Sequence, residues 1–291
     1  MAALQELSRN LHAAGYDVSP EGGVTYLYAS GGALVSKQWN GTSFGDEELI
    51  NSSARPNSQS IFLITPEERV VVGISSSNTL SINKFNEDDE EWAEDGCLPT
   101  PAVHPDSKLA GYVDTDGSKH VLYQDPSGNL VHLQGSEKSD IIPVKATSGT
   151  PLAVVAQETP LIFYVSSQDN FTHQVTRKDG AWADAVVTPF EVKRKLSRLE
   201  LAPDAETKTL VVYCLADDGT LFQISTEQGG EGEETVLGKV SADGVFKSAT
   251  SAECCPRVVP CYRPRPSYSS SFSFSFAFSG SFSSSSSYRY C

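Results

Sequence analysis

The amino-acid sequence predicts an all-β protein of the β-propeller type. Five segments resemble one another, and each contains short apolar strands joined by polar turns. Equivalent positions recur at intervals of 41 to 50 residues, and the chain of 291 residues has the length of one large all-β domain. A β-sandwich could also bury a core of short strands, but its strands would not form similar copies. The repeat therefore favours the propeller.

Each copy contains a pair of adjacent apolar strands separated by a turn rich in Gly, Asn, Asp or Ser. The predicted pairs are 25–29 with 33–37, 70–74 with 79–82, 120–124 with 129–133, 161–165 with 171–175, and 210–214 with 220–224. The positions that define the interval are Tyr28, Gly73, Tyr123, Tyr164 and Tyr213. Three or four short strands in a period of this length are typical of one propeller blade.

Further strands are predicted on both sides of these pairs. Upstream segments 61–64, 109–113 and 152–155 are rich in small and aliphatic residues, which suits an innermost strand where blades crowd around the axis. An aromatic residue and a turn follow the third strand, and an outer strand such as 185–187 is expected after them. Stacking such blades in a ring covers the sheet faces and leaves only short edges.

The repeat stops near residue 250. A sixth copy is predicted to begin at 244–249, and then the composition changes. We therefore divide the chain into a propeller domain at 1–250 and a Ser/Phe/Tyr-rich tail at 251–291. Three interpretations of the tail remain open: a disordered segment, a β-prone strand with alternating Phe and Ser, or an error in the gene model that replaces a true last blade. The third is favoured because a closed ring needs its final blade.

Composition narrows the classes of partner and location. The formal net charge of −15 repels phosphate backbones, so nucleic acid and anionic membranes are disfavoured as partners. The start of the chain lacks the basic and apolar pattern of a signal peptide, and no stretch has the apolar length of a membrane span. A cytoplasmic location is expected, with non-classical release left open. The six cysteines fit neither a disulfide scaffold nor a zinc site, and no cofactor is expected.

The third copy resembles a known family. The string from His120 through Asp125 to His132, together with Gly180-Ala181-Trp182, is similar to the blade of fungal fucose-specific lectins. The resemblance covers about residues 10–250 and implies a six-bladed propeller, usually dimeric, that binds glycans between adjacent blades. Five blades are recognisable here, and the last is truncated or altered. A homodimer and fucosylated glycans are the partners that this resemblance implies.

The residues that bind sugar in that family are replaced here. The resemblance places an Arg on the second strand, a Glu or Gln on the third, and an aromatic ring that stacks on the sugar. The Arg position holds Thr25, Val70, His120, Leu161 and Leu210. The Glu position holds Ser36, Ile82 or its neighbour Ser81, His132, His173 and Gln223. The aromatics Trp39, Trp92 and Trp182 are retained, so the scaffold is kept while fucose specificity is altered or lost.

These positions supply the candidate sugar-binding residues. His120 and His132 could face one pocket and replace the Arg/Glu pair, with His173 at the equivalent site of the next blade and Gln223 as a substitute for Glu. The alternative is that surface histidines merely lie on neighbouring strands. Likewise, the three tryptophans either stack on sugars or pack between blades. Neither the two histidines nor the acidic segments 86–91 and 114–117 have the full ligand pattern of a metal site.

No catalytic motif is present, so we do not expect an enzyme. The favoured function is a lectin-like carbohydrate-binding propeller. The alternative is a protein-interaction propeller that no longer binds sugar. A hydrolase of the sialidase or glycosidase type is a weaker third hypothesis, since it requires carboxylates over the central channel, where the predicted inner strands carry Ala, Gly, Val and Leu.

Overall fold

The computed structural model of the chain describes residues 2–19, 22–136, 138–156, 159–188, 191–203, 210–225 and 233–249. The predicted tail at 251–291 lies outside the described residues. The described part is almost entirely β-structure, with one α-helix, α1, at Ala2–His12.

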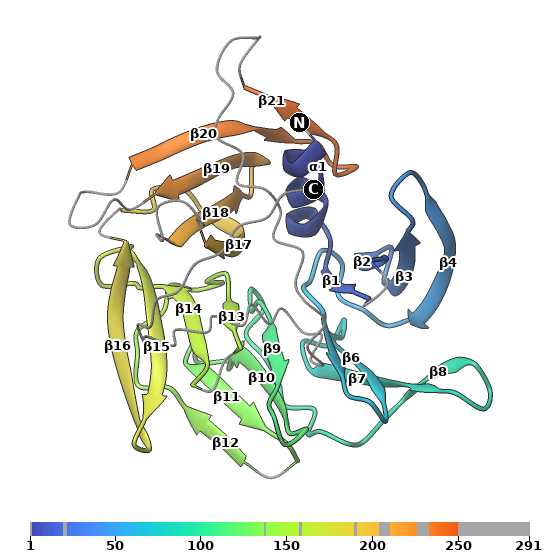
Figure 1. Ribbon diagram of the computed structural model, residues 1–291. Coiled ribbons are helices and arrows are strands. Elements are labelled where there is room, and N and C mark those ends of the chain that lie inside the picture. Colours follow the sequence, from blue (N-terminus) through green and yellow to red (C-terminus); the bar gives the residue numbers. More distant parts are fainter. Residues whose placement is uncertain are drawn as a thin grey trace, which may run out of the picture.

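Five antiparallel sheets form the blades of a propeller, and Figure 1 shows them arranged around a central axis. Blade I contains β1 (Gly15–Val18), β2 (Val24–Ser30), β3 (Ala33–Trp39) and β4 (Phe44–Asn51). Blade II contains β5 (Ile61–Ile64), β6 (Arg69–Ile74), β7 (Leu80–Asn86) and β8 (Glu91–Glu94). Blade III contains β9 (Ala110–Val113), β10 (Lys119–Gln124), β11 (Leu130–Gln134) and β12 (Lys138–Ile141).

The last two blades follow the same pattern. Blade IV contains β13 (Ala153–Val155), β14 (Leu161–Val165), β15 (Thr172–Lys178) and β16 (Ala181–Thr188). Blade V contains β17 (Leu196–Pro203), β18 (Leu210–Ala216), β19 (Thr220–Ser225), β20 (Glu233–Val240) and β21 (Phe246–Ser248). The predicted strand pairs and the predicted inner strands of blades II, III and IV are confirmed.

The hydrophobic core lies between the blades rather than inside a single sheet. Blades II and III share one buried cluster, blades III and IV a second, blades IV and V a third, and blades I and II a fourth. Because side chains alternate across a strand, each blade presents one set of residues to the preceding blade and the other set to the following blade.

Small residues let the innermost strands approach one another at the axis. A Cβ at Gly15 would lie 2.1 Å from the carbonyl oxygen of Ser60, and a Cβ at Gly111 would lie 2.3 Å from Cδ1 of Ile61. These distances are far below van der Waals contact, so a larger side chain would force neighbouring blades apart. The predicted role of small residues on the inner strands is confirmed.

Helix α1 was not predicted, and it closes the ring between blade V and blade I (Figure 1). Leu4, Leu7 and Leu11 lie on one helical face and pack into the buried cluster of blade V. On the same side, the Ser8 hydroxyl and the Gln5 amide each donate a hydrogen bond of 3.1 Å to the carbonyl of Gly244. The other side of the helix faces blade I, where Asn10 Oδ1 accepts a hydrogen bond of 2.9 Å from Tyr26.

The prediction that a sixth copy begins at 244–249 is wrong. Residues Phe246–Ser248 form β21, which pairs with β20 as a fifth strand on the outer edge of blade V. A tight turn reverses the chain, with Gly244 at a φ of 77° and its N–H bonded to the carbonyl of Ser241. Among the described residues there are five sheets, and α1 fills the interval between the first and the last.

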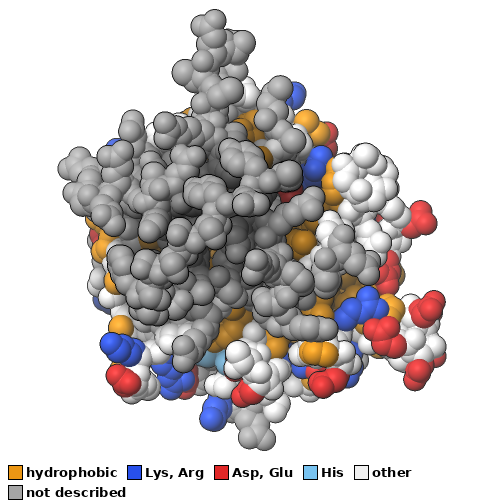
Figure 2. All heavy atoms as spheres, in the orientation of Figure 1, with side chains coloured by type: hydrophobic (Ala, Val, Ile, Leu, Met, Phe, Trp, Pro, Cys, Tyr) orange, Lys and Arg blue, Asp and Glu red, His pale blue; other side chains and the backbone are white. Residues whose placement is uncertain are grey.

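The surface carries charges of both signs. On the face in Figure 2, acidic and basic side chains alternate with apolar ones around the periphery of the ring. In the part of the chain that the structure describes, no helix has the length and apolar character of a membrane span. Within the same ranges, no cluster of three or more His, Cys, Asp or Glu residues could hold a metal ion.

Truncation of Leu11 tests the closing role of α1. Leu11 is 3% exposed and packs with Leu215 and Leu221 of blade V. We expect Leu11→Ala to lower the free energy of unfolding by about 3 kcal/mol, through lost burial and the cavity left behind. Urea unfolding followed by circular dichroism measures this. Leu49→Ala is the matched control because Leu49 is 58% exposed, and an equal loss in the two variants would contradict a closing role for α1.

Candidate functional site

The structure distributes the seven candidate residues over four spaces between neighbouring elements. His120, His132, His173 and Trp182 lie between blades III and IV, Trp92 lies between blades I and II, Trp39 lies between α1 and blade I, and Gln223 lies on the α1 side of blade V. The candidates therefore form one cluster and three separate positions rather than one equivalent pocket in every blade.

His120 and His132 form a buried stack between blades III and IV. His120 Nδ1 lies 2.9 Å from His132 Nε2, and His120 Nε2 lies 2.9 Å from Oδ2 of Asp114. The ring of Tyr112 stacks on His120 with a centroid distance of 4.3 Å and an interplanar angle of 2°. Both nitrogens of His120 therefore have partners within the protein. The two histidines are only 4% and 5% exposed.

Trp182 lies at the outer end of this stack. It is the second residue of β16, and its ring meets His132 edge-to-face with a centroid distance of 5.6 Å. The guanidinium of Arg177 lies 5.4 Å from the Trp182 ring centroid, and its Nη1 donates a hydrogen bond of 2.9 Å to Asp140 on blade III. Trp182 is partly exposed, and the side chains of Arg177 and Asp140 are 43% and 44% exposed. We call the space between blades III and IV the III/IV groove. Trp182, Arg177 and Asp140, at its exposed edge, are called its rim.

The electrostatic environment of His132 follows from its burial. Desolvation, and then the neighbouring His120, lower the pKa of His132 to about 4. The imidazole is therefore neutral at physiological pH, and it contributes a hydrogen-bonding ring rather than a charge to the groove.

His173 lies in the same interblade space but is not equivalent to His132. In the sheet register His132 pairs with Leu122, whereas His173 pairs with Tyr164, which is on the opposite face of its own blade. The predicted equivalence of His132 and His173 is thus wrong by one residue. The hairpin of blade IV has one more residue between its paired strands than the hairpin of blade III. His173 faces blade III beside Tyr164, while His132 faces blade IV.

Two carboxylates hold His173. Its Nδ1 lies 2.9 Å from Oδ2 of Asp184, and its Nε2 lies 3.0 Å from Oδ2 of Asp169. Burial by itself would lower the pKa of His173, but the hydrogen bonds to Asp169 and Asp184 raise it above the ordinary value. His173 is 6% exposed, and all of its ring nitrogens have protein partners.

Trp92 joins blade II to blade I. Its indole Nε1 donates a hydrogen bond of 3.0 Å to Oε1 of Glu48 on β4, and Oε2 of the same carboxylate accepts one of 3.0 Å from the Ser36 hydroxyl. Ser36 is the position where the family resemblance places a sugar-binding Glu. Here Glu48 of the neighbouring strand bonds to Ser36, and the same carboxylate accepts the hydrogen bond from Trp92.

The remaining two candidates face α1. The Trp39 ring is covered by the Arg9 guanidinium, 4.0 Å from the ring centroid, and lies 4.9 Å from the Phe44 ring. Gln223 shares a strand face with Leu221 and pairs with Tyr213, both of which belong to the cluster packed by the helix. Helix α1 therefore lies between these two candidates, where a further blade would otherwise stand.

Sequence reasoning missed Arg177 and Asp140. The signal for Arg177 was present, since Asp179-Gly180 forms the turn of a hairpin in which Arg177 pairs directly with Trp182. Asp140 could not be found in this way because it belongs to another blade. Its position beside Arg177 depends on how blades III and IV pack.

Comparison with known proteins shows the fold of this chain. AofleA from Arthrobotrys oligospora is similar at 12% identity, with a TM-score of 0.54, over 80% of this chain and 74% of that one. The fucose-specific lectin from Aleuria aurantia, a six-bladed β-propeller, is similar at 12% identity with a TM-score of 0.53, over 74% of this chain and 73% of that one. The SapL1 lectin, solved with alpha methyl fucoside, is similar at 11% identity with a TM-score of 0.54, over 75% and 78%.

No protein-family model matches the sequence, and no curated protein sequence matches it significantly. The resemblance predicted from the repeat is confirmed at the level of fold: this chain shares the propeller architecture of fungal fucose-specific lectins.

The low pKa of His132 predicts how stability depends on pH. A group whose pKa is lower in the folded state stabilises the fold fully above its unfolded value and loses that contribution as pH falls. We expect a loss of about 3 kcal/mol between pH of about 6.5 and 4, because the unfolded chain takes up a proton that the folded one does not. His132→Gln should lack this component of the unfolding free energy.

Urea unfolding of both proteins at several pH values measures the difference. His104→Gln is the control, since His104 lies outside the buried stack and its replacement should leave the pH-dependent component in place. A difference between the wild type and His132→Gln that stays constant from pH of about 7 to 4 would refute this role of burial.

Proposed function

We propose that this chain is a carbohydrate-binding β-propeller without catalytic activity, and that the rim of the III/IV groove is its glycan-binding surface. The observation that carries the proposal is the arrangement of Trp182, Arg177 and Asp140 on a fold shared with fucose-binding lectins. Fucosylated glycans are the ligand class to test first.

The fold supports the proposal through the proteins that share it. The Aleuria aurantia lectin is fucose-specific, and the SapL1 lectin was solved with alpha methyl fucoside. These ligands belong to those proteins. They indicate that this architecture can bind small sugars, which is why a glycan is the first ligand to test here.

The rim supplies the chemistry that sugar recognition needs. An indole ring offers flat apolar surface for the C–H face of a pyranose. The Arg177 guanidinium offers several N–H donors in a fixed plane, and Asp140 offers carboxylate acceptors. Because Arg177 and Asp140 are bonded to each other, both side chains are already oriented beside the ring before a ligand arrives.

A second candidate function is protein binding. The buried stack of Tyr112, His120 and His132 fills the interior of the III/IV groove and leaves only its rim accessible. A shallow rim with an aromatic residue and an Arg is also the composition of a protein-binding hot spot. The experiment below separates the two candidates.

Glycan-array binding with free fucose as competitor tests the proposed site. We expect Trp182→Ala and Arg177→Gln each to reduce binding by about tenfold or more, through lost stacking area and lost charge-assisted hydrogen bonds. The matched control is Arg69→Gln, since Arg69 lies 3.7 Å over the Phe85 ring and pairs with Glu87, the same arrangement on blade II.

Each outcome decides between the candidates. Fucose-competed binding that Trp182→Ala and Arg177→Gln remove and Arg69→Gln keeps supports the proposed site. Binding that all three variants keep places the sugar elsewhere. If the protein has the circular dichroism spectrum of a folded β-sheet but binds no glycan on the array, the lectin proposal is overturned in favour of protein binding.

A further inference from the structure

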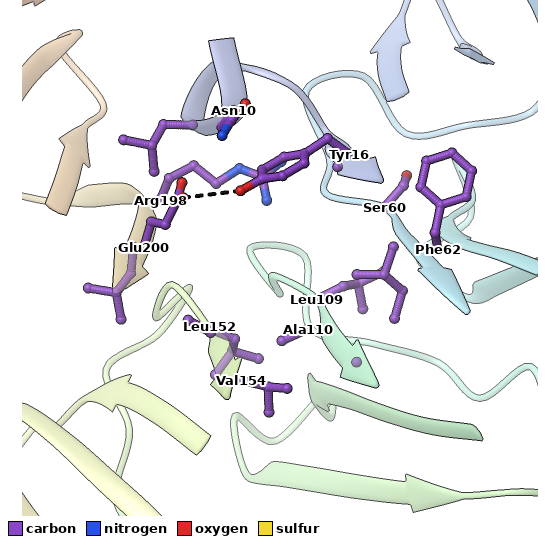
Figure 3. Close-up of a pocket in the computed structure, with 16 residues that line it drawn as sticks. Asn10, Tyr16, Ser60, Phe62, Leu109, Ala110, Leu152, Val154, Arg198 and Glu200 are labelled. Atoms are coloured by element: carbon purple, nitrogen blue, oxygen red, sulfur yellow. Dashed lines mark hydrogen bonds between the residues drawn. The ribbon is translucent and has the colours of Figure 1, made fainter. Parts of the chain in front are cut away.

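A polar cavity lies at the central axis, apart from the interblade rim. All five innermost strands and α1 line it, and Figure 3 shows Tyr16, Arg198 and Glu200 gathered on one side of it with Leu109, Ala110, Leu152 and Val154 opposite. The three predicted inner strands offer few polar groups, whereas β1 and β17, which were not predicted, carry these polar side chains. The empty volume of about 550 Å³ includes the open mouth, so the enclosed interior is smaller.

Arg198 carries a positive charge into this cavity, and Glu200 is the carboxyl group that attracts it there. Its Nη2 donates a hydrogen bond to the backbone carbonyl of Ala13, and it forms no ion pair with any carboxylate among the described residues. Burial lowers the pKa of Arg198 to about 10, which still leaves the guanidinium charged. A buried cation without a partner is costly, and proteins usually pair such a group or use it to bind an anion.

The nearest carboxyl group only partly compensates this charge. Glu200 is 9% exposed, and its Oε1 accepts a hydrogen bond of 3.1 Å from the Tyr16 hydroxyl rather than from Arg198. Burial raises the pKa of Glu200 to about 7, although the Tyr16 hydrogen bond and Arg198 act in the opposite direction. Near neutral pH this side chain is therefore protonated in a large fraction of molecules, and it can then donate a hydrogen bond.

One further cation, Lys108, lies near Arg198 in a chain whose net charge is −15. Gln59 connects the starts of two inner strands, because its Nε2 donates to the carbonyl of Ser197 and its Oε1 accepts from the N–H of Leu109. Lys108 and Arg198 are the sequence neighbours of Leu109 and Ser197, the two residues that Gln59 contacts. The pKa of Lys108 is lowered by burial and then by the proximity of Arg198, which indicates that the two positive charges are close enough to repel each other.

We propose that the central cavity binds a compact organic carboxylate, with Arg198 pairing with its charge, Glu200, which Tyr16 holds in place, supplying a hydrogen bond, and Leu109, Leu152 and Val154 contacting its aliphatic part. The guanidinium, which Glu200 compensates only in part, selects an anion over a neutral polyol. The apolar opposite wall selects an organic anion over an inorganic one, and the limited interior space selects a ligand of a few carbon atoms. This site is independent of the proposed glycan surface.

Thermal-shift and calorimetric titration of the full chain with sodium L-lactate test the proposal. Sodium chloride at equal ionic strength and glycerol are the comparison solutes. We expect saturable stabilisation by lactate and none beyond the salt effect by chloride or glycerol. Arg198→Met, which keeps the volume of the side chain, should weaken lactate binding by about tenfold or more because it removes charged hydrogen bonds. Arg69→Met is the control, since the exposed Arg69 pairs with Glu87, does not line the cavity, and should leave binding unchanged.

A second variant keeps the test decisive if Arg198→Met does not fold. Glu200→Gln removes the competing carboxylate and keeps the shape of the side chain, so lactate binding at neutral pH should become several-fold tighter. Unchanged or weaker binding by Glu200→Gln contradicts the assigned geometry. No saturable response to lactate in the wild type, or a response to glycerol of equal size, overturns the anion site, and neither result depends on whether the rim binds glycans.

Discussion

Each sheet of this protein is apolar on both faces, and everything else in the structure depends on covering those faces. A four-stranded blade covers one face with its predecessor and the other with its successor, so the sheets must form a ring. Four interblade clusters satisfy this requirement between blades I and V. The last interval is closed by α1, which places leucines against blade V and polar side chains against blade I. A helix can do this because one of its faces is apolar and the other is polar.

The same requirement controls where polar chemistry can occur. Between blades, a polar side chain must bring its own partners, as His120 does with His132 and Asp114, and as Trp92 does with Glu48. Such groups are fully occupied inside the fold. Polar side chains that a ligand could reach lie at two other places that we consider, the exposed rim where Trp182 meets Arg177, and the central axis where the inner strands surround Arg198. The two proposed sites lie at these two places.

The fold was largely predictable, and the candidate site only in part. Strong local patterns identified the strand pairs of all five blades and three of the five inner strands. The pattern also placed His120 and His132 together, since they lie on paired strands. It did not show that the histidines are buried, nor that His173 faces the other way. A shift of one residue in a hairpin reverses the face of a side chain, and a sequence pattern rarely fixes register so closely.

By itself, the sequence determined the repeat, the propeller architecture and the residues that could carry chemistry, because alternation and turn residues are local properties of the chain. Only the tertiary structure decided how the ring closes, which face each side chain occupies, and which distant groups meet. Arg177 of blade IV meets Asp140 of blade III, and Tyr16 meets Glu200, which lies 184 residues further along the chain. Such contacts depend on the packing of whole blades, and no short segment of the sequence contains that information.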